Sequence, residues 1–407
     1  MILHPDRRLP RVAVNVLYRV GSRDDPEGRA GLAHLLEHLM FMGTTRVPEG
    51  RFDQLLEGAG AWSNAYTSED FTVYYDVGPS RLLETLLWLE ADRATGVAEA
   101  LTEEKLRLQR DVVLNELWQD YHNTPYGVAE LVKPRLMYPP RHPYARPVIG
   151  SAEEVRAISV ADVRRHLGRF YTPKNASLVV AGDLDVERTL RLVERFFGWI
   201  DGPETARSVD RPRAPRRRRE VSRTLIDAVE LPKLVLSWYS PAHFEPGDAE
   251  MDLVGEILAT GKRSRLHRAL VHDARLALRV EAYQLSRPLG SMFEVGVTAR
   301  RGVDLRRLEV MVSALLARLS RAGPTTAELD RARRKFETGF LSGLQQLHRR
   351  AELLNTYAET LGRPDGVATD LGRYRKVDRS SMVAACDTVL GRSGCRVWVV
   401  PRGGSVG

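Results

Sequence analysis

The chain has 407 residues, of which 43% are apolar and 28% are charged, and its formal net charge is +8. This length predicts two or three domains with real hydrophobic cores; the composition excludes a disordered chain, and the lack of a long apolar run excludes a membrane span. The positive charge comes largely from arginines mixed with acidic residues and accompanies no nucleic-acid-binding motif, so we interpret it as solvated surface charge and predict no nucleic-acid partner.

The amino-terminal segment contains two predicted strands and no export signal. Ile2-Leu3 has the composition of a strand end, and Val12 to Tyr18 predicts a second strand. No charged stretch leads into an apolar one after Met1, which predicts a cytoplasmic location for the chain as written. A start upstream of Met1, with an export signal of its own, would place the protein in the periplasm instead.

A polar turn and Gly31 precede the most informative stretch of the chain, His34-Leu35-Leu36-Glu37-His38. Two histidines four residues apart lie on one side of an α-helix because 3.6 residues complete a turn. That side can bind a metal ion, and Glu37 lies there too, where its carboxylate can take a proton from a metal-activated water. The order is the reverse of the H-E-x-x-H zinc motif. By chance, a chain of this composition contains such a pattern roughly 0.03 times, so the context must decide.

The next elements are a short helix, a strand pair and two longer helices. We predict a helix over 51–57, antiparallel strands over 61–67 and 72–77, and helices over 80–94 and 102–121. The two strands are joined through Ser68-Glu69-Asp70, and Thr102 caps the last helix. All of these elements belong to the same half of the chain as the histidine motif.

Glu116 lies deep in the helix over 102–121, where its apolar neighbours predict contact with a core. These neighbours are Val112, Val113, Leu114 and Leu117. A buried acid needs a partner, and a zinc ion bound by His34 and His38 would provide one. Two imidazoles and one carboxylate, with a fourth position open for water, form the donor set of a hydrolytic zinc site. Amide hydrolysis is the chemistry that this set predicts.

The first half ends in a helix, a strand and a further helix, predicted over 159–170, 176–182 and 185–199. The composition then changes, because the stretch from Gly202 to Arg219 contains three prolines and the dense arginine block Arg211 to Arg219. Such a stretch is typical of a linker. We therefore predict a zinc-binding domain over 1–202, a linker over 203–220 and a second domain over 221–407.

The second half repeats the element order of the first. We predict strands over 223–229, 234–239, 277–286, 292–298 and 396–400 and helices over 248–259, 264–273, 305–322, 326–361 and 380–390. The repeat indicates an internal duplication, although the segment from Leu258 to Leu266, which we match to the histidine helix, has no metal ligand. Cys386 and Cys395 flank a short turn and form no metal-binding pattern, so we predict free thiols, with a disulfide as the alternative.

Together these motifs resemble the family of pitrilysin, insulin-degrading enzyme and the mitochondrial processing peptidase, and most closely its short bacterial members. The resemblance covers nearly the whole chain and follows the family's motif order. Its markers are the histidine motif with Met40-Phe41-Met42-Gly43-Thr44; Asn64-Ala65-Tyr66-Thr67-Ser68; Leu89-Glu90-Ala91-Asp92-Arg93; Arg110-Asp111-Val112-Val113-Leu114-Asn115-Glu116; His142-Pro143-Tyr144 with Ile149-Gly150; and Tyr171-Thr172-Pro173-Lys174-Asn175-Ala176 before Gly182-Asp183.

The resemblance implies an α+β fold with two homologous αβ domains, each an antiparallel-rich sheet covered by helices on one side, which together form one half-clamp of a clam-shell peptidase. It implies zinc-dependent endopeptidase activity on extended peptides. One Zn²⁺ per chain is expected at His34, His38 and Glu116, with Glu37 as the catalytic base. Asn64-Ala65 is expected on an edge strand to which the substrate adds as a further strand. An ordinary turn-flanking role for Asn64 stays open.

Two departures from the family pattern concern catalysis. Many members have a second glutamate seven residues before the metal-binding one, where this chain has Gln109. Members also use an arginine and a tyrosine from the ligand-free half, six or seven residues apart, to hold the substrate and the developing oxyanion. Val271 and Leu278 occupy the matching positions here, and Tyr283 does not restore the pair.

The incomplete oxyanion site predicts a homologous second subunit that supplies the arginine and the tyrosine, so we expect a heterodimer rather than a homodimer. The alternative from another functional class is a non-catalytic scaffold subunit, which the intact set of metal ligands disfavours. The peptide substrate stays open among peptide debris, cleaved leader peptides and a dedicated precursor peptide.

Overall fold

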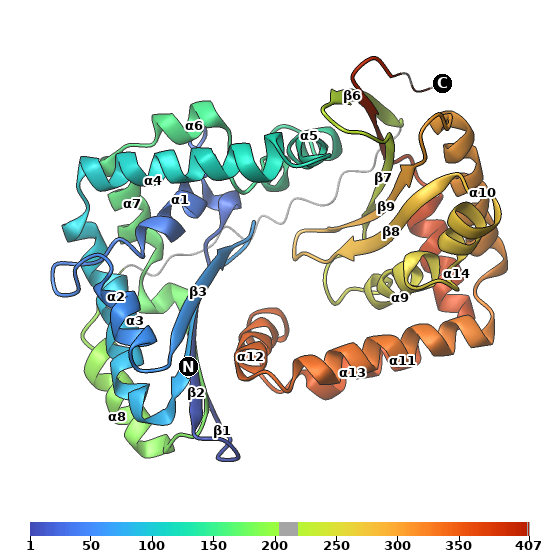
Figure 1. The fold of residues 1–407 in the computed structure, drawn as a ribbon. Coiled ribbons are helices and arrows are strands. Elements are labelled where there is room, and N and C mark those ends of the chain that lie inside the picture. Colours follow the sequence, from blue (N-terminus) through green and yellow to red (C-terminus); the bar gives the residue numbers. More distant parts are fainter. Residues whose placement is uncertain (203–218, 405, 407) are drawn as a thin grey trace. The chain divides into compact units, whose positions relative to one another are not determined.

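The structure, a computed structural model, describes residues 1–202, 219–404 and 406 and groups them into two compact units (Figure 1). Unit 1 takes its described residues from Met1–Leu117, Arg146–Val209 and Leu341–Gly366, and unit 2 takes them from Trp118–Ala145, Asp210–Phe340 and Val367–Gly407. Each unit thus includes a segment from the opposite half of the sequence, which element order alone did not predict. The domain boundaries at 202 and 221 stay a prediction, because residues 203–218, with most of the arginine block, lie outside the described residues.

The sheet of unit 1 has five strands in the order β1-β5-β2-β4-β3. They are β1 (Ile2–Pro5), β2 (Arg11–Tyr18), β3 (Trp62–Thr67), β4 (Thr72–Pro79) and β5 (Ala176–Gly182). β1 pairs with β5 in parallel, and the other neighbours are antiparallel. Within the described sheet β3 pairs only with β4, so its other side is a free edge that can accept a further strand.

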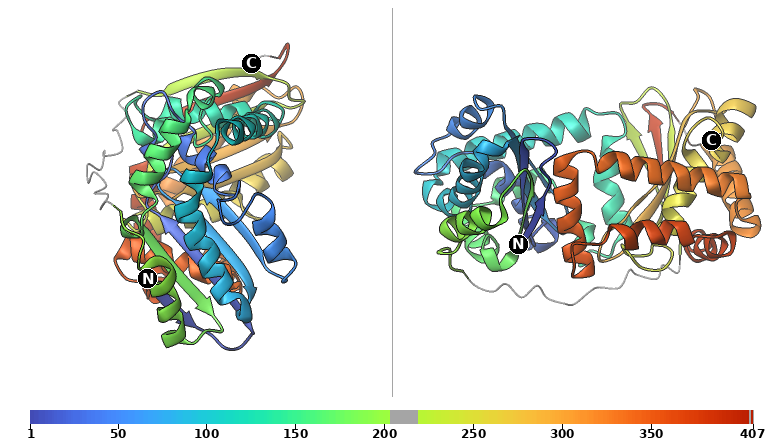
Figure 2. Two further views of the ribbon diagram at one scale, coloured as in Figure 1. Left: turned by 90° about the vertical axis from the view of Figure 1, so that its left-hand side faces the viewer. Right: turned by 90° about the horizontal axis from the view of Figure 1, so that it is seen from below.

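Helices cover both faces of this sheet, whereas the resemblance implied helices on one side. The helices of unit 1 are α1 (Leu32–Leu39), α2 (Arg51–Glu57), α3 (Leu83–Ala100), α4 (Glu103–Glu116), α6 (Ala152–Ala157), α7 (Val160–Phe170), α8 (Val186–Phe197) and α12 (Leu347–Leu361). On one face, Ala351 of α12 packs against Ala13 and Val77. On the other face, Arg93 of α3 forms an ion pair with Asp76 of β4. Figures 1 and 2 show α12 along the side of the sheet opposite α3.

The prediction of one helix over 326–361 is wrong, because the chain forms two helices there. α11 (Thr326–Gly343) ends at a glycine, and Gln346 is extended (φ −85°, ψ 122°) just before α12. Glycine weakens a helix by about 1 kcal/mol relative to alanine, and the break allows Leu347 and Leu354 to pack on the sheet of unit 1. Likewise, the predicted helix over 102–121 is α-helical only to Glu116 and continues as a π-helical turn, Leu117–His122.

The sheet of unit 2 has the same topology as that of unit 1, with the order β6-β10-β7-β9-β8. Its strands are β6 (Val221–Asp227), β7 (Lys233–Ser240), β8 (Ala277–Leu285), β9 (Ser291–Ala299) and β10 (Cys395–Pro401). Again one outer pair, β6 with β10, is parallel and the others are antiparallel. This match confirms the internal duplication. By element order the counterpart of α1 is α9 (Asp248–Ala259), which contains no histidine. The segment 258–266, predicted to match α1, overlaps α9 only at its first two residues.

Unit 2 is covered by α5 (Gly127–Met137), α9, α10 (Leu305–Ala322), α11, α13 (Val367–Lys376) and α14 (Arg379–Leu390). α5 comes from the first half of the sequence, yet its Ala129 and Met137 share a core with β10. α13 was not predicted. Cys386 and Cys395 are free, as predicted, and both are buried. None of the helices in the described ranges combines the length and the apolar character needed to cross a bilayer. The predicted α+β fold with two homologous units is confirmed.

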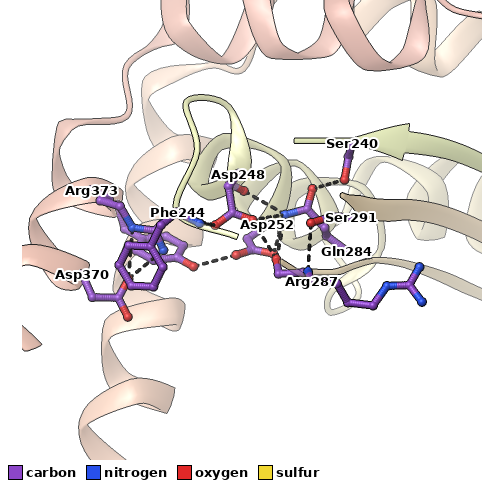
Figure 3. A network of polar contacts seen from close by, with 11 residues as sticks. Ser240, Phe244, Asp248, Asp252, Gln284, Arg287, Ser291, Asp370 and Arg373 are labelled. Atoms are coloured by element: carbon purple, nitrogen blue, oxygen red, sulfur yellow. Dashed lines mark hydrogen bonds and ion pairs between the residues drawn. The ribbon is translucent and has the colours of Figure 1, made fainter. Parts of the chain in front are cut away.

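A polar network joins α9, β8 and α13 in unit 2 (Figure 3). Asp248 of α9 is 0% exposed and accepts hydrogen bonds from Gln284 Nε2 and Arg373 Nη1, each at 2.8 Å. Arg373 also donates a hydrogen bond to Asp370 at 2.7 Å, and its guanidinium lies over the ring of Phe244. A buried carboxylate is tolerated only when it is paired in this way. The network therefore anchors the first turn of α9 against the edge strand β8.

Asp252, one turn further along α9, is expected to make the stability of unit 2 depend on pH. Burial, the largest cause, raises its pKa to about 7 against the opposing hydrogen bond from Tyr374 OH at 2.6 Å. In the unfolded chain an aspartate has a pKa of about 3.9. The contribution of Asp252 to folding stability is therefore highest below about pH 4, where Asp252 is protonated in both states, and it falls as pH rises from there through about 7. Between these values Asp252→Asn should gain up to about 4 kcal/mol in unfolding free energy relative to wild type, measured by thermal unfolding at each pH.

A matched control is Asp111→Asn, which makes the same change at an exposed position of α4. Its stability should follow the wild-type pH dependence. Parallel curves for Asp252→Asn and wild type would contradict the raised pKa of Asp252.

Candidate metal centre

α1 directs its three ionisable residues, all half-buried, to one side and buries its leucines on the other. The buried residues, each 0% exposed, are Leu32, Leu35, Leu36 and Leu39. They fix the helix against the core of unit 1. The side chains of His34 and His38 are 14% and 24% exposed, and their ring centroids are 4.8 Å apart. The four-residue spacing thus brings both imidazoles to one side of the helix, as predicted.

The start of α1 is fixed by Asp25 and Gly31, whose contacts the sequence analysis did not predict. The Asp25 carboxylate is buried and accepts hydrogen bonds from the backbone nitrogens of Gly31 and Ala33, at 2.8 and 2.9 Å. Gly31 has φ 95°, and a Cβ there would lie 2.7 Å from the carbonyl oxygen of Ile149. Only glycine fits such a position without strain. The available signal was the acidic turn ahead of the helix, since Asp commonly accepts bonds from the first helical N–H groups.

Glu116 reaches the two histidines from the last turn of α4. Its Oε1 atom lies 3.7 Å from His34 Nε2, and its Oε2 atom lies 3.3 Å from His38 Nε2. One ligand atom from each of the three residues lies within 4.8 Å of the others. Val112, which we placed against a core, is 43% exposed, and the Glu116 side chain is 32% exposed. The carboxylate therefore meets the histidines at the edge of a core and not within it.

This donor set fits a zinc ion. A tetrahedral zinc with bonds of about 2.0 Å holds its ligand atoms about 3.3 Å apart, so the observed separations need only small side-chain movements. Burial lowers the pKa of His34 to about 4, although the charge of Glu116 opposes the shift, so its imidazole is neutral and able to bind a metal. The hydrogen bond from His38 lowers the pKa of Glu116 and keeps it a carboxylate. Elsewhere in the described ranges, no three His, Cys, Asp or Glu side chains are arranged to hold an ion.

Glu37 lies beside the histidines and is held by Thr67, the last residue of β3. Thr67 Oγ1 donates a hydrogen bond to Glu37 Oε2 at 2.5 Å. Burial raises the pKa of Glu37 above its ordinary value, while the bond from Thr67 opposes this rise. A carboxylate with a raised pKa accepts a proton more readily at neutral pH. Thr67 appeared in the sequence only as part of a motif, and its contact with Glu37 joins the free edge of the sheet to the candidate centre.

Asn64 and Ala65 lie on the edge strand β3, as expected from the resemblance. Asn64 is exposed, and its Oδ1 atom accepts a hydrogen bond from the backbone nitrogen of Ala65 at 2.8 Å. Exposed and half-buried residues alternate along the strand. A peptide that added to this edge would therefore offer its backbone to β3 and its side chains to two different surfaces. The substrate-binding role of both residues stays a prediction.

The structure also places the residues that depart from the family pattern. Gln109 Nε2 donates to Met42 Sδ at 2.8 Å. In unit 2, Val271 packs against the core and Leu278 is 56% exposed. Tyr283 OH donates a hydrogen bond to the buried carboxylate of Glu294 at 2.8 Å. Neither Val271 nor Leu278 can donate a side-chain hydrogen bond, and the hydroxyl of Tyr283 is already used within unit 2.

Two family models match the chain in succession. A model described as Insulinase (Peptidase family M16) matches residues 1–136, which include His34, Glu37, His38 and Glu116. A model described as Peptidase M16 inactive domain matches residues 157–336. The division agrees with the ligand content of the chain, because the candidate centre lies entirely in the first match.

Curated proteins and solved structures give the same result. The zinc protease PqqE of Helicobacter pylori is 28% identical over 339 residues, which are 82% of this chain and 75% of that protein. An uncharacterized zinc protease of Mycobacterium leprae is 27% identical over 383 residues, 90% of this chain and 80% of that protein. The crystal structure of a protease from Helicobacter pylori has a TM-score of 0.88 at 26% identity and covers 97% of this chain and 95% of its own. In sequence and fold, the chain is thus similar to proteins named as proteases.

Proposed function

Because the chain belongs to peptidase family M16, we propose that it is the metal-bearing subunit of a zinc-dependent endopeptidase that hydrolyses extended peptides or small unfolded proteins. The proposal is carried by one observation, the convergence of His34, His38 and Glu116 from two helices within 4.8 Å of one another. Glu37 lies beside the two histidines on α1. The last residue of the free edge strand β3, Thr67, donates a hydrogen bond to Glu37.

The residues of the centre have distinct roles in this proposal. His34, His38 and Glu116 hold one zinc ion per chain, through the imidazoles of both histidines and the ionised carboxylate of Glu116; the imidazole of His34 is neutral, as described above. The ion, when bound, supplies a Lewis acid that polarises the peptide carbonyl and lowers the pKa of water. Glu37 takes a proton from the attacking water and returns it to the leaving amine. The hydrogen bond from Thr67 holds the Glu37 carboxylate in position for both transfers.

β3 provides the surface on which a substrate lies. Main-chain hydrogen bonds to an edge strand hold any extended peptide, so the peptide must be unfolded but its sequence is little restricted. Asn64 and Ala65 are the edge residues expected to make these bonds, with the Asn64 amide giving up its bond to Ala65 nitrogen as the peptide binds. Peptide debris, cleaved leader peptides and a dedicated precursor all satisfy this requirement.

A homologous second subunit completes the active site in this proposal. Val271 and Leu278 cannot stabilise an oxyanion, and the hydroxyl of Tyr283 already donates a hydrogen bond to Glu294. The partner is therefore expected to contribute an arginine and a tyrosine, as in a heterodimer of two related chains. A homodimer would lack the pair in both copies.

The proposed ligand set is tested by Glu116→Gln. Loss of the ionised oxygen should weaken zinc binding by more than about 100-fold, because even second-shell changes cost 10- to 100-fold. Competition with a chromophoric chelator measures the affinity. Glu104→Gln makes the same change at an exposed position in the first turn of α4 and should bind zinc like wild type. Equal zinc affinity in wild type and Glu116→Gln would remove Glu116 from the ligand set.

A non-catalytic scaffold is the second candidate function. It is favoured by the missing arginine and tyrosine and by the description of the model that matches residues 157–336 as an inactive domain. A scaffold has no need of the three convergent ligands. Zinc content separates the two functions, since the enzyme subunit should purify with one zinc per chain and the scaffold with none.

A further inference from the structure

A cavity of about 570 Å³ lies within unit 1, at the end of β3 away from the metal centre. It is bounded by the turn between β1 and β2, by Trp62 at the start of β3 and by the first turn of α12. Three arginines line it: Arg8 from the turn between β1 and β2, Arg11 from the start of β2 and Arg350 from α12. These residues come from separate stretches of the sequence, so no sequence motif predicts the cavity.

The cavity carries a net positive charge. Its one carboxylate, Asp6, accepts bonds from Arg8 at 2.7 Å and from Arg350 at 2.5 Å and is neutralised by them. In the parts of the chain that the structure describes, Arg11 makes no side-chain hydrogen bond or ion pair, so its guanidinium is available. The first turn of α12 adds partial positive charge at the same wall. A guanidinium in this state is best satisfied by a carboxylate.

The cavity lies on one particular face of β3. Trp62 packs against His348 of α12, and Tyr66 OH donates a hydrogen bond to Glu352 of α12 at 2.9 Å. Thr67 instead meets Glu37 on the opposite face. Even-numbered residues of β3 thus face α12 and the cavity, whereas odd-numbered residues face the metal centre. Directly paired residues of neighbouring strands point to the same face, so the peptide residue opposite Trp62 would direct its side chain to the face of the sheet on which the cavity lies.

We propose that this cavity is a carboxylate-binding subsite, which takes an acidic side chain or the C-terminal carboxylate of the peptide lying along β3. The inference rests on the proposed function of β3. Trp62 and Thr67 are five residues apart, about 17 Å along an extended strand. β4 separates β3 from β2, which carries Arg11, so the peptide must run past Trp62 and turn toward β2 to reach the cavity. The subsite therefore selects a negative group at least five residues from the peptide residue beside Glu37. The subsite adds a preference for negative charge to the edge of β3, which otherwise binds only the peptide backbone.

Binding to the zinc-loaded Glu37→Gln chain tests the subsite without hydrolysis. Isothermal titration is carried out with three acetylated peptides of about twelve residues, ~40 Å when extended. The first is neutral with an amidated C-terminus, the second has one glutamine replaced by glutamate, and the third is the neutral peptide with a free C-terminal carboxylate. We expect the second or third to bind about three- to tenfold more tightly than the first at low salt. The preference should disappear near 1 M salt, because salt screens the charge. Comparison of the second and third peptides shows whether the subsite binds a glutamate side chain or a C-terminal carboxylate.

Arg11→Gln should abolish the preference, and Arg11→Lys should retain most of it. Arg51→Gln removes the same charge from an exposed position on α2 outside the cavity and should leave the preference intact. Equal affinities for all three peptides, or a preference that survives Arg11→Gln, would overturn the subsite while leaving β3 as the binding edge. No binding of any peptide would overturn both the subsite and the proposed role of β3.

Discussion

Replacing Glu37 with glutamine is expected to lower peptide turnover by roughly 10³- to 10⁴-fold while one zinc ion per chain stays bound. Glutamine has nearly the shape of glutamate and can still accept the hydrogen bond from Thr67 Oγ1, which lies 2.5 Å from Glu37 Oε2. It cannot take a proton from water or return one to the leaving amine. The measurement is kcat for an unstructured peptide, with zinc content determined on the same samples.

Glu57→Gln provides the matched control, since it makes the same change at the exposed end of α2. This variant should keep both turnover and zinc. Wild-type turnover in Glu37→Gln would refute the assignment of the base. Loss of zinc together with turnover would instead make Glu37 a structural part of the metal site.

Addition of a homologous subunit that carries the arginine and tyrosine should raise turnover by about 100- to 1000-fold over the chain alone, because loss of a single oxyanion donor costs this much in other acyl-transfer enzymes. Unit 2 has no donor at the matching positions, where Val271 and Leu278 stand. Tyr283 cannot substitute while its hydroxyl is bonded to the buried Glu294. The measurement compares kcat for the chain, for a relative encoded beside it, and for their mixture.

The control for this experiment is the same relative with its tyrosine changed to phenylalanine. It should still bind the chain but should restore little turnover. Robust peptide hydrolysis by the chain alone would contradict the need for a partner. If the two chains form a complex but kcat does not rise above that of the chain alone, the role assigned to the tyrosine is contradicted.

The histidine helix could be predicted from sequence because its information is local. The spacing of His34 and His38 determines that they share a side of α1, and the leucines between them determine which side is buried. Glu116 was identified from sequence as well, although 82 positions separate it from His34. Its signal was an acid in a helix with apolar neighbours. The structure brings the three residues together, but whether they bind zinc stays a prediction.

The features that sequence reasoning missed all depend on contacts between distant segments. The break between α11 and α12 places Ala351 on the sheet of unit 1. No local pattern shows that the helix ends at Gly343, because a glycine can also occur within a continuous long helix. Thr67 meets Glu37 only because the edge strand ends beside α1. The carboxylate subsite combines Arg11 with Arg350, which lie at opposite ends of the chain. Such arrangements follow from tertiary packing and leave no periodic signal.

The duplicated units show how one framework can keep or lose a metal site. α9 takes the place of α1 in the element order, but it packs so closely on β8 that a Cβ on Gly255 would lie 2.9 Å from the carbonyl oxygen of Ala282. The network of Asp248, Gln284 and Arg373 fixes the start of the same helix. Unit 2 therefore uses this position for packing and polar anchoring, whereas unit 1 uses it for the candidate centre.

The central claim is that His34, His38 and Glu116 hold one zinc ion. Anomalous diffraction at the zinc edge, from crystals of the chain purified with zinc, tests it most directly. We predict one anomalous peak per chain, about 2.0 to 2.2 Å from an Nε2 atom of each histidine and from a carboxylate oxygen of Glu116. A chain without a stoichiometric peak, or with its peak at other residues, would contradict the claim.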